Sequence, residues 1–342
     1  MGDAPPEPRS PSRARRLARW LLAPGLTLLA LLVFVGACLT MPGRSLEGPL
    51  PTLDAEEQAR ATLLSRHVEA LATTLGERNV SRAPGQLAAA ADYVIAELEA
   101  SGYDVRRERY TVDGVEVENL IAELPGSAEI VVIGAHYDSA VGTPGADDNA
   151  SGVAALLVLA RELRARQPRR TLRFVAFTNE EPPWFHGPEM GARHHARAAK
   201  ARGDEIVAML SLESIGYYRD EPGSQRYPAP FGAFYPDRGD FLMFVGNVAS
   251  TGLVRRSVKA FRSARRFPSE GAAVPASIPG VDWSDHRAFW EEGYKALMIT
   301  DTAPNRNPRY HEPDDTADTV DVARLSLVVS GLRAVIEALA GA

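Results

Sequence analysis

Three patterns of hydrophobic and polar residues alternate along this chain. Residues 20–40 form an uncharged apolar run, residues 55–75 repeat apolar positions every three or four residues, and residues 129–139 are an apolar block that ends in polar residues. These patterns are typical of a membrane-spanning helix, an amphipathic helix and a buried strand, respectively. The same reasoning predicts helices at 55–75, 85–101, 151–165, 188–201 and 320–340, a hairpin over 103–124, and strands at 129–139, 171–181, 206–218, 241–247 and 295–302.

Strands that alternate with helices are typical of a mostly parallel sheet covered on both faces. We therefore predict an α/β fold with a mostly parallel mixed sheet, preceded by one N-terminal transmembrane helix. An α/β domain of about 250–300 residues can form a single core, so the 342 residues do not require a second domain. The predicted divisions are a basic cytoplasmic tail at 1–19, a transmembrane anchor at 20–40, a Pro- and Gly-rich linker at 41–58, and one folded domain at 59–342.

The distribution of charge predicts an orientation for the anchor. Residues 1–19 carry five arginines and two acidic residues, a net of +3, so the rest of the chain sums to −9 within a total of −6. A basic flank before an apolar run predicts a cytoplasmic N-terminus and an exported folded domain in a single-pass membrane protein. The acidic domain argues against nucleic-acid binding, which needs a basic face.

The apolar run has two further interpretations. It resembles a long signal peptide with a cleavage site at residues 35–37, or a lipoprotein processing box that leaves a lipidated Cys38, the only cysteine of the chain. We favour the uncleaved anchor because the run exceeds the usual length of a signal peptide. All three interpretations place the folded domain outside the cytoplasm.

Polar residues collect where the predicted strands end. In open α/β sheets, ligands bind beyond the carboxyl ends of the strands. Taken alone, a histidine or a pair of acidic residues there has an ordinary structural explanation, and Asp147-Asp148-Asn149 before a helix suits an N-cap. Glu213 is harder to explain, because it interrupts an apolar strand and a buried carboxylate needs a partner or a metal. The full set, which predicts a metal site, is His136, Asp138, Glu180, Glu181, Glu213 and Asp301.

Six short segments carry a resemblance to a known family. They are GAHYDS (134–139), GADDNASG (145–152), TNEE (178–181), SLESIGY (211–217), SDH (284–286) and YHEPDDT (310–316). Together they resemble the co-catalytic zinc aminopeptidases, in the family's order and over about residues 60–342, and the specificity of the resemblance lies in the six segments together. Secreted bacterial leucyl aminopeptidases belong to this family, and glutamate carboxypeptidase II, the transferrin receptor and glutaminyl cyclase are relatives.

The resemblance implies a role for individual residues of this chain. The bridging aspartate falls on Asp148 and not on Asp147, because the family places it four residues before the Gly of the Ser-Gly pair. Glu213 stands where many members have Asp, so the geometry of one metal could differ. The positions that match metal ligands are His136, Asp148, Glu181, Glu213 and His311. The other matched positions are Glu180 as general base, Asp138 as the carboxylate that orients His136, and Tyr310 as a tyrosine that polarises the carbonyl.

Ligand chemistry agrees with this assignment. Imidazole and carboxylate ligands suit Zn²⁺, and two zinc ions per chain would each take three protein ligands and share Asp148. Metals about 3.5–4 Å apart generate a nucleophile near neutral pH. Glu180 would carry the proton of the attacking water to the leaving amine. Cobalt or manganese could replace zinc on the same ligands.

The resemblance implies an enzyme that hydrolyses N-terminal residues from peptides. Two alternatives are a glutaminyl cyclase-like aminoacyltransferase, which uses one zinc, and a non-catalytic receptor-type domain; carboxypeptidase action is a variant of the peptidase reading. We expect a supporting role for Asp285-His286, and a solvated position for His194-His195 on a helix. The aromatic residues from which one or two would contact substrate are Trp184, Tyr217, Tyr218, Trp283, Phe289 and Trp290.

Overall fold

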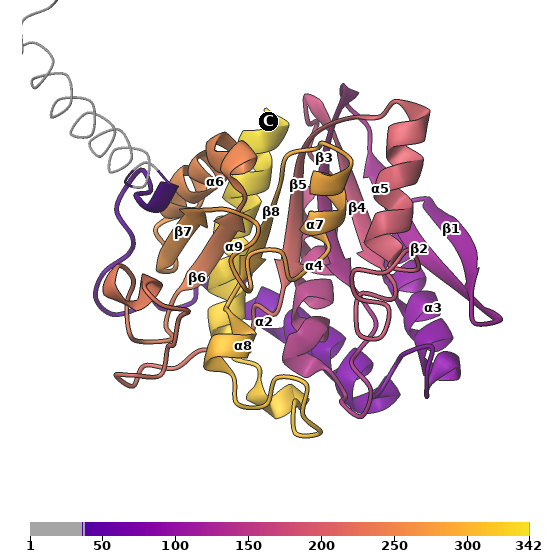
Figure 1. Cartoon of the computed structure of the whole chain (residues 1–342), viewed down its shortest axis with the longest axis horizontal. Helices are drawn as coiled ribbons and strands as arrows, with labels where there is room; N and C mark the ends of the chain where they lie inside the picture. Colours follow the sequence, from indigo (N-terminus) through magenta and orange to yellow (C-terminus); the bar gives the residue numbers. More distant parts are fainter. Residues whose placement is uncertain (1–35, 37, 342) are drawn as a thin grey trace, which may run out of the picture.

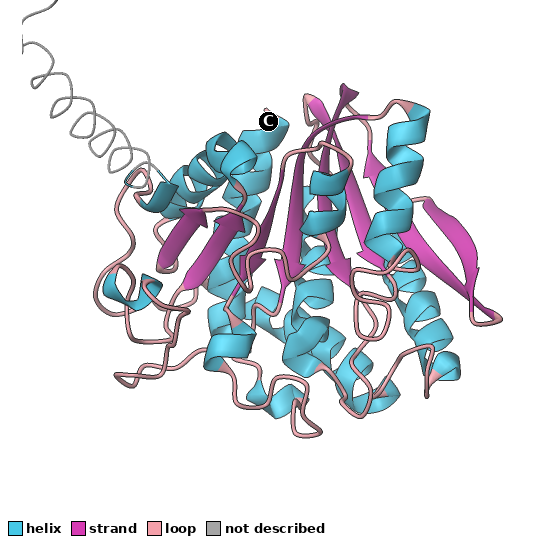
Figure 2. Ribbon diagram, viewed as in Figure 1, coloured by secondary structure: helices cyan, strands magenta, loops and turns pink. Residues whose placement is uncertain are grey.

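The computed structural model describes residues 36 and 38–341, which form an eight-stranded mixed sheet between two layers of helices (Figure 1, Figure 2). The strand order is β1-β2-β4-β3-β5-β8-β6-β7. Parallel pairing joins β4, β3, β5 and β8 in the middle of the sheet, and antiparallel pairs lie on both sides of it. The strands are β1 Val105–Val112, β2 Val115–Leu124, β3 Ser127–His136, β4 Arg170–Phe177, β5 Glu205–Glu213, β6 Leu242–Gly246, β7 Ser269–Ala273 and β8 Ala296–Thr300.

Most helices follow the predicted periodicity. The predicted helix at 55–75 is an α-helix only as far as Val68, and its last turn is π-helical. Asp54 caps its start, because its side chain accepts from the backbone N–H of Glu57 while Glu57 reaches back to the backbone of Asp54. The α-helices are α2 Ala55–Val68, α3 Pro84–Ala100, α4 Gly152–Leu163, α5 Gly191–Arg202, α6 Thr251–Ala264, α7 His286–Glu291, α8 Ala303–Arg306 and α9 Val322–Ala340.

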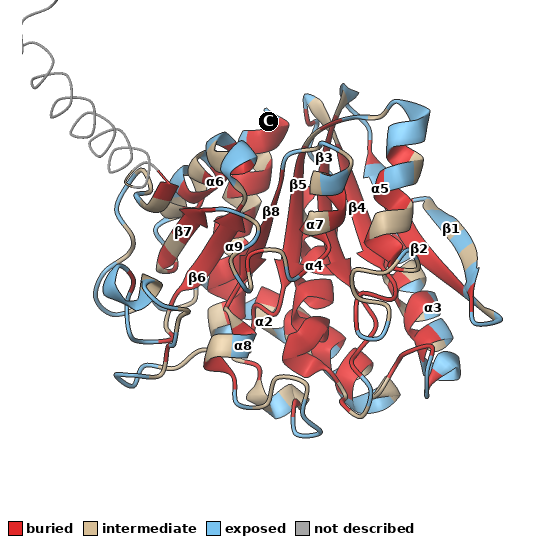
Figure 3. Ribbon diagram, viewed as in Figure 1, coloured by how far each residue is buried: buried red, intermediate tan, exposed pale blue. Residues whose placement is uncertain are grey.

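The two faces of the sheet are covered unequally. Helices α2, α3, α4, α6 and α9 pack on one face around the largest apolar cluster, whereas α5 and α7 cover β2 to β8 on the other. The central strands are buried on both faces, as Figure 3 shows. Alternate residues of β6 and β8 therefore belong to clusters on opposite faces of the sheet. Phe244 and Ile299 belong to the large cluster under the helices, whereas Met243 and Met298 belong to a smaller cluster that residues of the loops help to form.

The predicted hairpin is present as β1 and β2. Its turn residues Asp113 and Gly114 both have positive φ, 49° and 82°, which a two-residue hairpin turn of this kind requires. The sequence analysis predicts no element over residues 251–273 or 286–291, where the structure has α6, β7 and α7. Strand β7 is short and its sequence SEGAA offers no bulky apolar residue, whereas the stripe of α6 residues that includes Leu253, Val258 and Phe261 is a helical signal that the analysis missed.

The predicted tail and almost all of the predicted anchor lie outside the described residues. No helix within 36 and 38–341 combines the length and apolarity needed to cross a bilayer. Residues 41–54, predicted as part of a linker, lie along α6 and β7. Arg262 donates to the carbonyls of Met41 and Gly43, and Ser45 Oγ accepts from the backbone N–H of Ser269 at 2.8 Å.

Candidate metal centre

Four parallel strands deliver the predicted site residues to one edge of the sheet. His136 is the last residue of β3, and Glu213 is the last residue of β5. Glu180 and Glu181 follow β4 by three and four residues. Asp148 lies in the irregular turn Ala146–Ser151 that leads into α4, and His311 lies in the loop after α8, with φ of 60°. The carboxyl ends of parallel strands are where open α/β sheets bind ligands.

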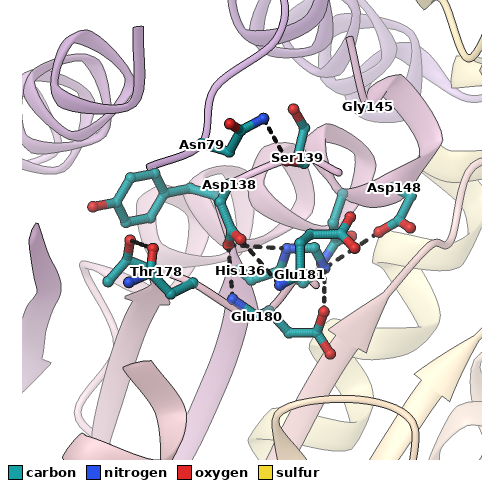
Figure 4. Close-up of polar contacts among 12 residues, drawn as sticks. Asn79, His136, Asp138, Ser139, Gly145, Asp148, Thr178, Glu180 and Glu181 are labelled. Atoms are coloured by element: carbon teal, nitrogen blue, oxygen red, sulfur yellow. Dashed lines mark hydrogen bonds and ion pairs between the residues drawn. The ribbon is translucent and has the colours of Figure 1, made fainter. Parts of the chain in front are cut away.

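The structure brings the five predicted ligands together in two groups that share one residue. The first group is His136, Asp148 and Glu213; the second is Asp148, Glu181 and His311. Within each group the potential ligand atoms lie within 4.8 Å of one another. Figure 4 shows His136, Asp148 and Glu181 converging from their separate segments.

Asp148 occupies the shared position because its two oxygens face different histidines. Its Oδ1 lies 3.2 Å from His136 Nε2, and its Oδ2 lies 3.2 Å from His311 Nε2. Glu213 Oε2 lies 3.4 Å from His136 Nε2 and Glu181 Oε2 lies 3.1 Å from His311 Nε2, which completes the two groups. The neighbouring Asp147 turns away and accepts from Asn307 Nδ2 at 2.9 Å, so it belongs to neither group.

Several atoms of this cluster that could coordinate a metal are buried and make no hydrogen bond among the described residues. They are His136 Nε2, Asp148 Oδ1, Glu181 Oε1 and His311 Nε2. Buried polar atoms are almost always paired, so such a set in one place points to a missing partner. Imidazole nitrogens and carboxylate oxygens are the ligands that Zn²⁺ takes in proteins. The residues present therefore fit a divalent metal pair.

The electrostatics of the cluster point the same way. Burial raises the pKa of Glu181 to about 7, with the charge of Asp148 adding to it, and burial together with Glu213 raises the pKa of Glu180 well above its usual range. Burial alone would lower the pKa of His136, but Glu213 and other carboxylates around it hold that pKa well above normal. The pKa of His311 is raised to about 10 because Asp148 and Glu181 outweigh its burial. Carboxylates crowded in a buried site hold protons unless a cation neutralises them.

Glu180 stands beside the two groups without belonging to either. Its Oε2 is 4.0 Å from His136 Nε2, and its carboxylate is absent from both ligand sets within the described chain. The adjacent Glu181 points to His311 instead. This divergence of neighbouring side chains leaves Glu180 free to exchange a proton.

Asp138 connects the histidine to the glutamate pair. Its Oδ1 accepts from the backbone N–H of Glu180 and its Oδ2 from that of Glu181, both at 3.1 Å, and Oδ1 also lies 3.4 Å from His136 Nδ1 (Figure 4). The carboxylate thus fixes the turn that carries Glu180 and Glu181 and faces the ring of His136. Tyr310 lies beside the second group, with its ring stacked on that of His311 at a centroid distance of 3.9 Å.

Sequence reasoning missed several residues that hold the site. Asp315 accepts from the backbone N–H groups of Asp147 and Asp148 at 3.0 and 3.2 Å. Ser284 and Ser214 donate to the two oxygens of Glu213 at 2.8 and 2.9 Å. Asp315 lies within the YHEPDDT segment, so a signal existed for it. The same holds for the serines, because Ser214 lies within SLESIGY and Ser284 within SDH, but their contacts with Glu213 join segments that only the fold brings together.

Other predicted candidates have different outcomes. Asp285 is buried beside the site and belongs to neither ligand group. Asp301 is also outside both groups, and its Oδ2 accepts from the backbone N–H of Tyr217 at 2.8 Å. The predicted solvated position of His195 is wrong: it is fully buried and its Nδ1 lies 3.0 Å from Glu108 Oε2. The helical periodicity of α5 turns His195 inward against the sheet.

An apolar cavity of about 110 Å³ opens beside Glu213 and Tyr310. Its floor includes Met243 and Met298 from β6 and β8. Of the six aromatic candidates predicted to contact substrate, only Trp283 lines it. Four other aromatic residues line it as well: Tyr227, Phe231, Tyr235 and Tyr310.

The sequence of this chain is similar to those of several known proteins. The Escherichia coli protein YfbL is 41% identical over 252 residues, covering 71% of this chain and 77% of YfbL. An Arthroderma otae protein named "Probable leucine aminopeptidase" is 28% identical over 242 residues, covering 66% of this chain and 57% of that protein. This chain therefore spans little more than half the length of that relative.

Solved structures share the fold at low sequence identity. A zinc aminopeptidase from Bacillus subtilis superposes with a TM-score of 0.65 at 14% identity, covering 85% of this chain and 95% of that one. A glutaminyl cyclase from Bacteroides thetaiotaomicron gives 0.61 at 19% identity, covering 84% and 99%. The sequence model of Peptidase family M28 matches residues 119–336, which is well over half of the chain and includes every predicted ligand. This chain belongs to Peptidase family M28.

Proposed function

We propose that this chain is a zinc-dependent aminopeptidase that binds two metal ions and removes N-terminal residues from peptides. The observation that carries the proposal is the pair of buried ligand groups joined at Asp148, with the carboxylate of Glu180 beside both and part of neither. The naming of the Arthroderma otae relative supports the same activity.

His136, Asp148 and Glu213 would hold one metal, and Asp148, Glu181 and His311 the other. When bound, a pair of divalent cations supplies Lewis-acid chemistry for hydrolysis. Glu180 accepts the proton of the attacking water and delivers it to the leaving amine. Burial together with the charge of Glu213 raises the pKa of Glu180, which helps its carboxyl to hold the proton between the two transfers. Tyr310, which lines the cavity, would donate a hydrogen bond to the substrate carbonyl.

The cavity beside the metal centre supports aminopeptidase over carboxypeptidase action. Glu213 is one of the residues that line it, and the described lining residues include no arginine or lysine. A free α-ammonium group is attracted to a carboxylate, whereas a C-terminal carboxylate needs a cationic partner. A cavity lined by a carboxylate and by no described cationic side chain therefore favours an N-terminal residue over a C-terminal one.

Metal content and hydrolysis of aminoacyl-arylamides test the proposal together. We expect two zinc ions per chain, activity that a chelator abolishes, and activity that returns with Zn²⁺. Glu180→Gln should keep both metals and lose about 10²–10⁴-fold in kcat, the usual contribution of general acid–base catalysis. Glu181→Gln should lose metal, because Glu181 belongs to a ligand group and Glu180 does not.

Three results would contradict the proposal. Activity that survives complete metal removal would exclude metal catalysis. One zinc per chain with cyclisation of N-terminal glutamine would favour the cyclase alternative. Failure to bind zinc at micromolar concentration would favour a receptor-type domain. Glu189→Gln, in the same β4–α5 loop but outside both ligand groups, is the matched control and should keep metal and activity.

We also propose that the apolar run at 20–40 anchors the chain in a membrane with the catalytic domain outside the cytoplasm. The proposal rests on the uncharged length and on the basic residues before it. A membrane fraction that releases the chain in alkaline carbonate, or a mature N-terminus that begins after residue 37, would contradict an uncleaved anchor.

A further inference from the structure

Two loops contribute to the lining of the apolar cavity. Residues 219–240, within the connection from β5 to β6, contribute Tyr227, Phe231 and Tyr235, and residues 274–283 form a second part of the lining. The strands β6 and β8 contribute Met243 and Met298, and Trp290 of α7 packs against the same cluster. The size of the cavity therefore depends in part on where the 219–240 loop lies.

The loop is closed on itself and is held to the domain at several points. Tyr235 Oη donates to the carbonyl of Gly271 at 3.0 Å, the backbone N–H of Arg226 donates to the carbonyl of Asn305 at 3.2 Å, and the side chain of Gln225 makes a further, buried attachment. The backbone N–H of Arg219 donates to the carbonyl of Gly239 at 2.8 Å, and that of Gln225 to the carbonyl of Asp237 at 3.0 Å. The side chain of Gln225 then reaches inward, where its Oε1 accepts from Arg306 Nε at 2.8 Å and its Nε2 donates to Thr302 Oγ1 at 2.9 Å.

Arg306 is an unusual residue for this position. It ends α8 and is 5% exposed, yet it takes part in no ion pair within residues 36 and 38–341. Instead, its Nη1 donates to the carbonyl of Phe241 at 3.0 Å, and its guanidinium carbon lies 4.7 Å from the centre of the Phe241 ring. Burying a cation outside a direct ion pair is costly, so these contacts and the charge of the nearby Asp301 must offset the lost hydration.

The side chain of Arg306 also lies against the loop backbone near the end of the loop, at Gly239. A Cβ atom at Gly239 would lie 2.8 Å from Arg306 Cδ, so only glycine lets the backbone pass this close. Arg306 thus contacts both ends of the loop, through Gln225 and Gly239, and also the first residue after it. The planar guanidinium offers these donors in fixed directions, which a lysine ammonium does not.

We propose that Arg306, acting through Gln225, positions the 219–240 loop, and that the loop held in this way sets the preference for a large apolar side chain at the substrate N-terminus. This inference rests on the proposed aminopeptidase function. The cavity of about 110 Å³ is of the same order as an apolar cavity of about 150 Å³ that binds benzene, so a leucyl or phenylalanyl side chain suits it. An alanyl side chain would leave the loop aromatics without contact.

The test compares leucyl- and alanyl-arylamides on the full zinc-loaded chain. Arg306→Lys and Gln225→Ala should each lower the leucine-to-alanine ratio of kcat/KM by about tenfold, because hydrophobic pockets discriminate about tenfold or more for each methylene group they contact. The loss should lie in a raised KM for the leucyl substrate. Gln225→Glu should keep the ratio near that of the native chain, because its carboxylate still accepts from Arg306 Nε.

The matched control is Arg173→Lys. Arg173, on β4 and away from the cavity, is also 5% exposed, but it forms ion pairs with Glu123 and Asp204, each at 2.6 Å. Its replacement should lower stability and leave the substrate ratio unchanged. If Arg306→Lys changes the ratio no more than Arg173→Lys does, the positioning role of Arg306 is refuted.

Limited trypsin digestion gives a readout that does not depend on activity. Of the arginines in the loop, Arg226 and Arg238 lie inside it and Arg219 at its start, and release of the loop should raise cleavage after Arg226 and Arg238 by at least about tenfold in Arg306→Lys and Gln225→Ala. Unchanged cleavage would overturn the inference. If the native chain hydrolyses no aminoacyl substrate while the cleavage still rises, the proposed function fails and only the attachment of the loop by Arg306 stands.

Discussion

Replacing Asp138 by asparagine should weaken the metal centre without removing any of its ligands. Asp138 accepts from two consecutive backbone N–H groups, those of Glu180 and Glu181, each at 3.1 Å. Asparagine has the same shape but only one acceptor oxygen. Whichever way the amide of the new asparagine is turned, its NH₂ group must face the backbone N–H of either Glu180 or Glu181, so one of the two hydrogen bonds is lost. The negative charge near His136 is also lost.

The size of the effect follows from these contacts. A hydrogen bond to a charged group contributes about 1.5–3 kcal/mol, and one of the two is lost outright. Mutation of a carboxylate that orients a ligating histidine costs about 10–100-fold in metal affinity or activity, which corresponds to about 1.4–2.8 kcal/mol. The two routes agree, so we expect Asp138→Asn to bind Zn²⁺ about 10–100-fold more weakly.

Competition with a chromophoric chelator measures this affinity directly, and kcat/KM at saturating zinc measures what remains of the activity. Asp321→Asn is the matched control: Asp321 also accepts a backbone N–H, from Arg324 at 2.9 Å, but at the start of α9. It should leave zinc affinity unchanged. An Asp138→Asn chain that binds zinc as tightly as the native chain would refute the reasoning.

Two further predictions concern stability. His67 is buried in α2, and burial together with the charge of Arg66 lowers its pKa to about 4. In the unfolded chain a histidine has a pKa of about 6.5, so the unfolded state takes up a proton at a higher pH than the folded state does. The free energy of unfolding should therefore decrease as the pH falls from about 6.5 to about 4, by up to about 3 kcal/mol. Urea titrations at several pH values should show a shallower loss in His67→Gln, and equal slopes would contradict this origin. Gly191→Ala should destabilise the fold by about 3 kcal/mol or more, because the new Cβ would lie 2.3 Å from the carbonyl oxygen of Thr178. Gly252→Ala, on α6 with no atom within 4 Å of the new Cβ, should stabilise the fold by about 0.5–1 kcal/mol. Similar denaturation midpoints for the two variants would exclude a steric conflict at Gly191.

Much of the fold could be predicted from local patterns. The apolar blocks that became β3, β4 and β5 and the periodic runs that became α3, α4 and α9 each carry their signal within one segment. The polar residues that end those strands needed only the rule that parallel strands present their carboxyl ends at one edge. The resemblance to zinc aminopeptidases then separated Asp148 from Asp147, and the structure places only Asp148 in the ligand groups.

By itself, the sequence determined the α/β class, the main elements and the types of ligand, because a repeat of 3.6 or 2 residues and a strand-terminal carboxylate are properties of neighbouring positions. Only the tertiary structure decided the strand order, the supports of the ligands and the cavity. Ser284 reaches Glu213 across 71 residues and Arg306 reaches Gln225 across 81, so neither contact leaves a periodic trace in the chain. Such contacts form when distant segments pack together, and their physical cause is the burial of polar groups that must find partners wherever the fold places them.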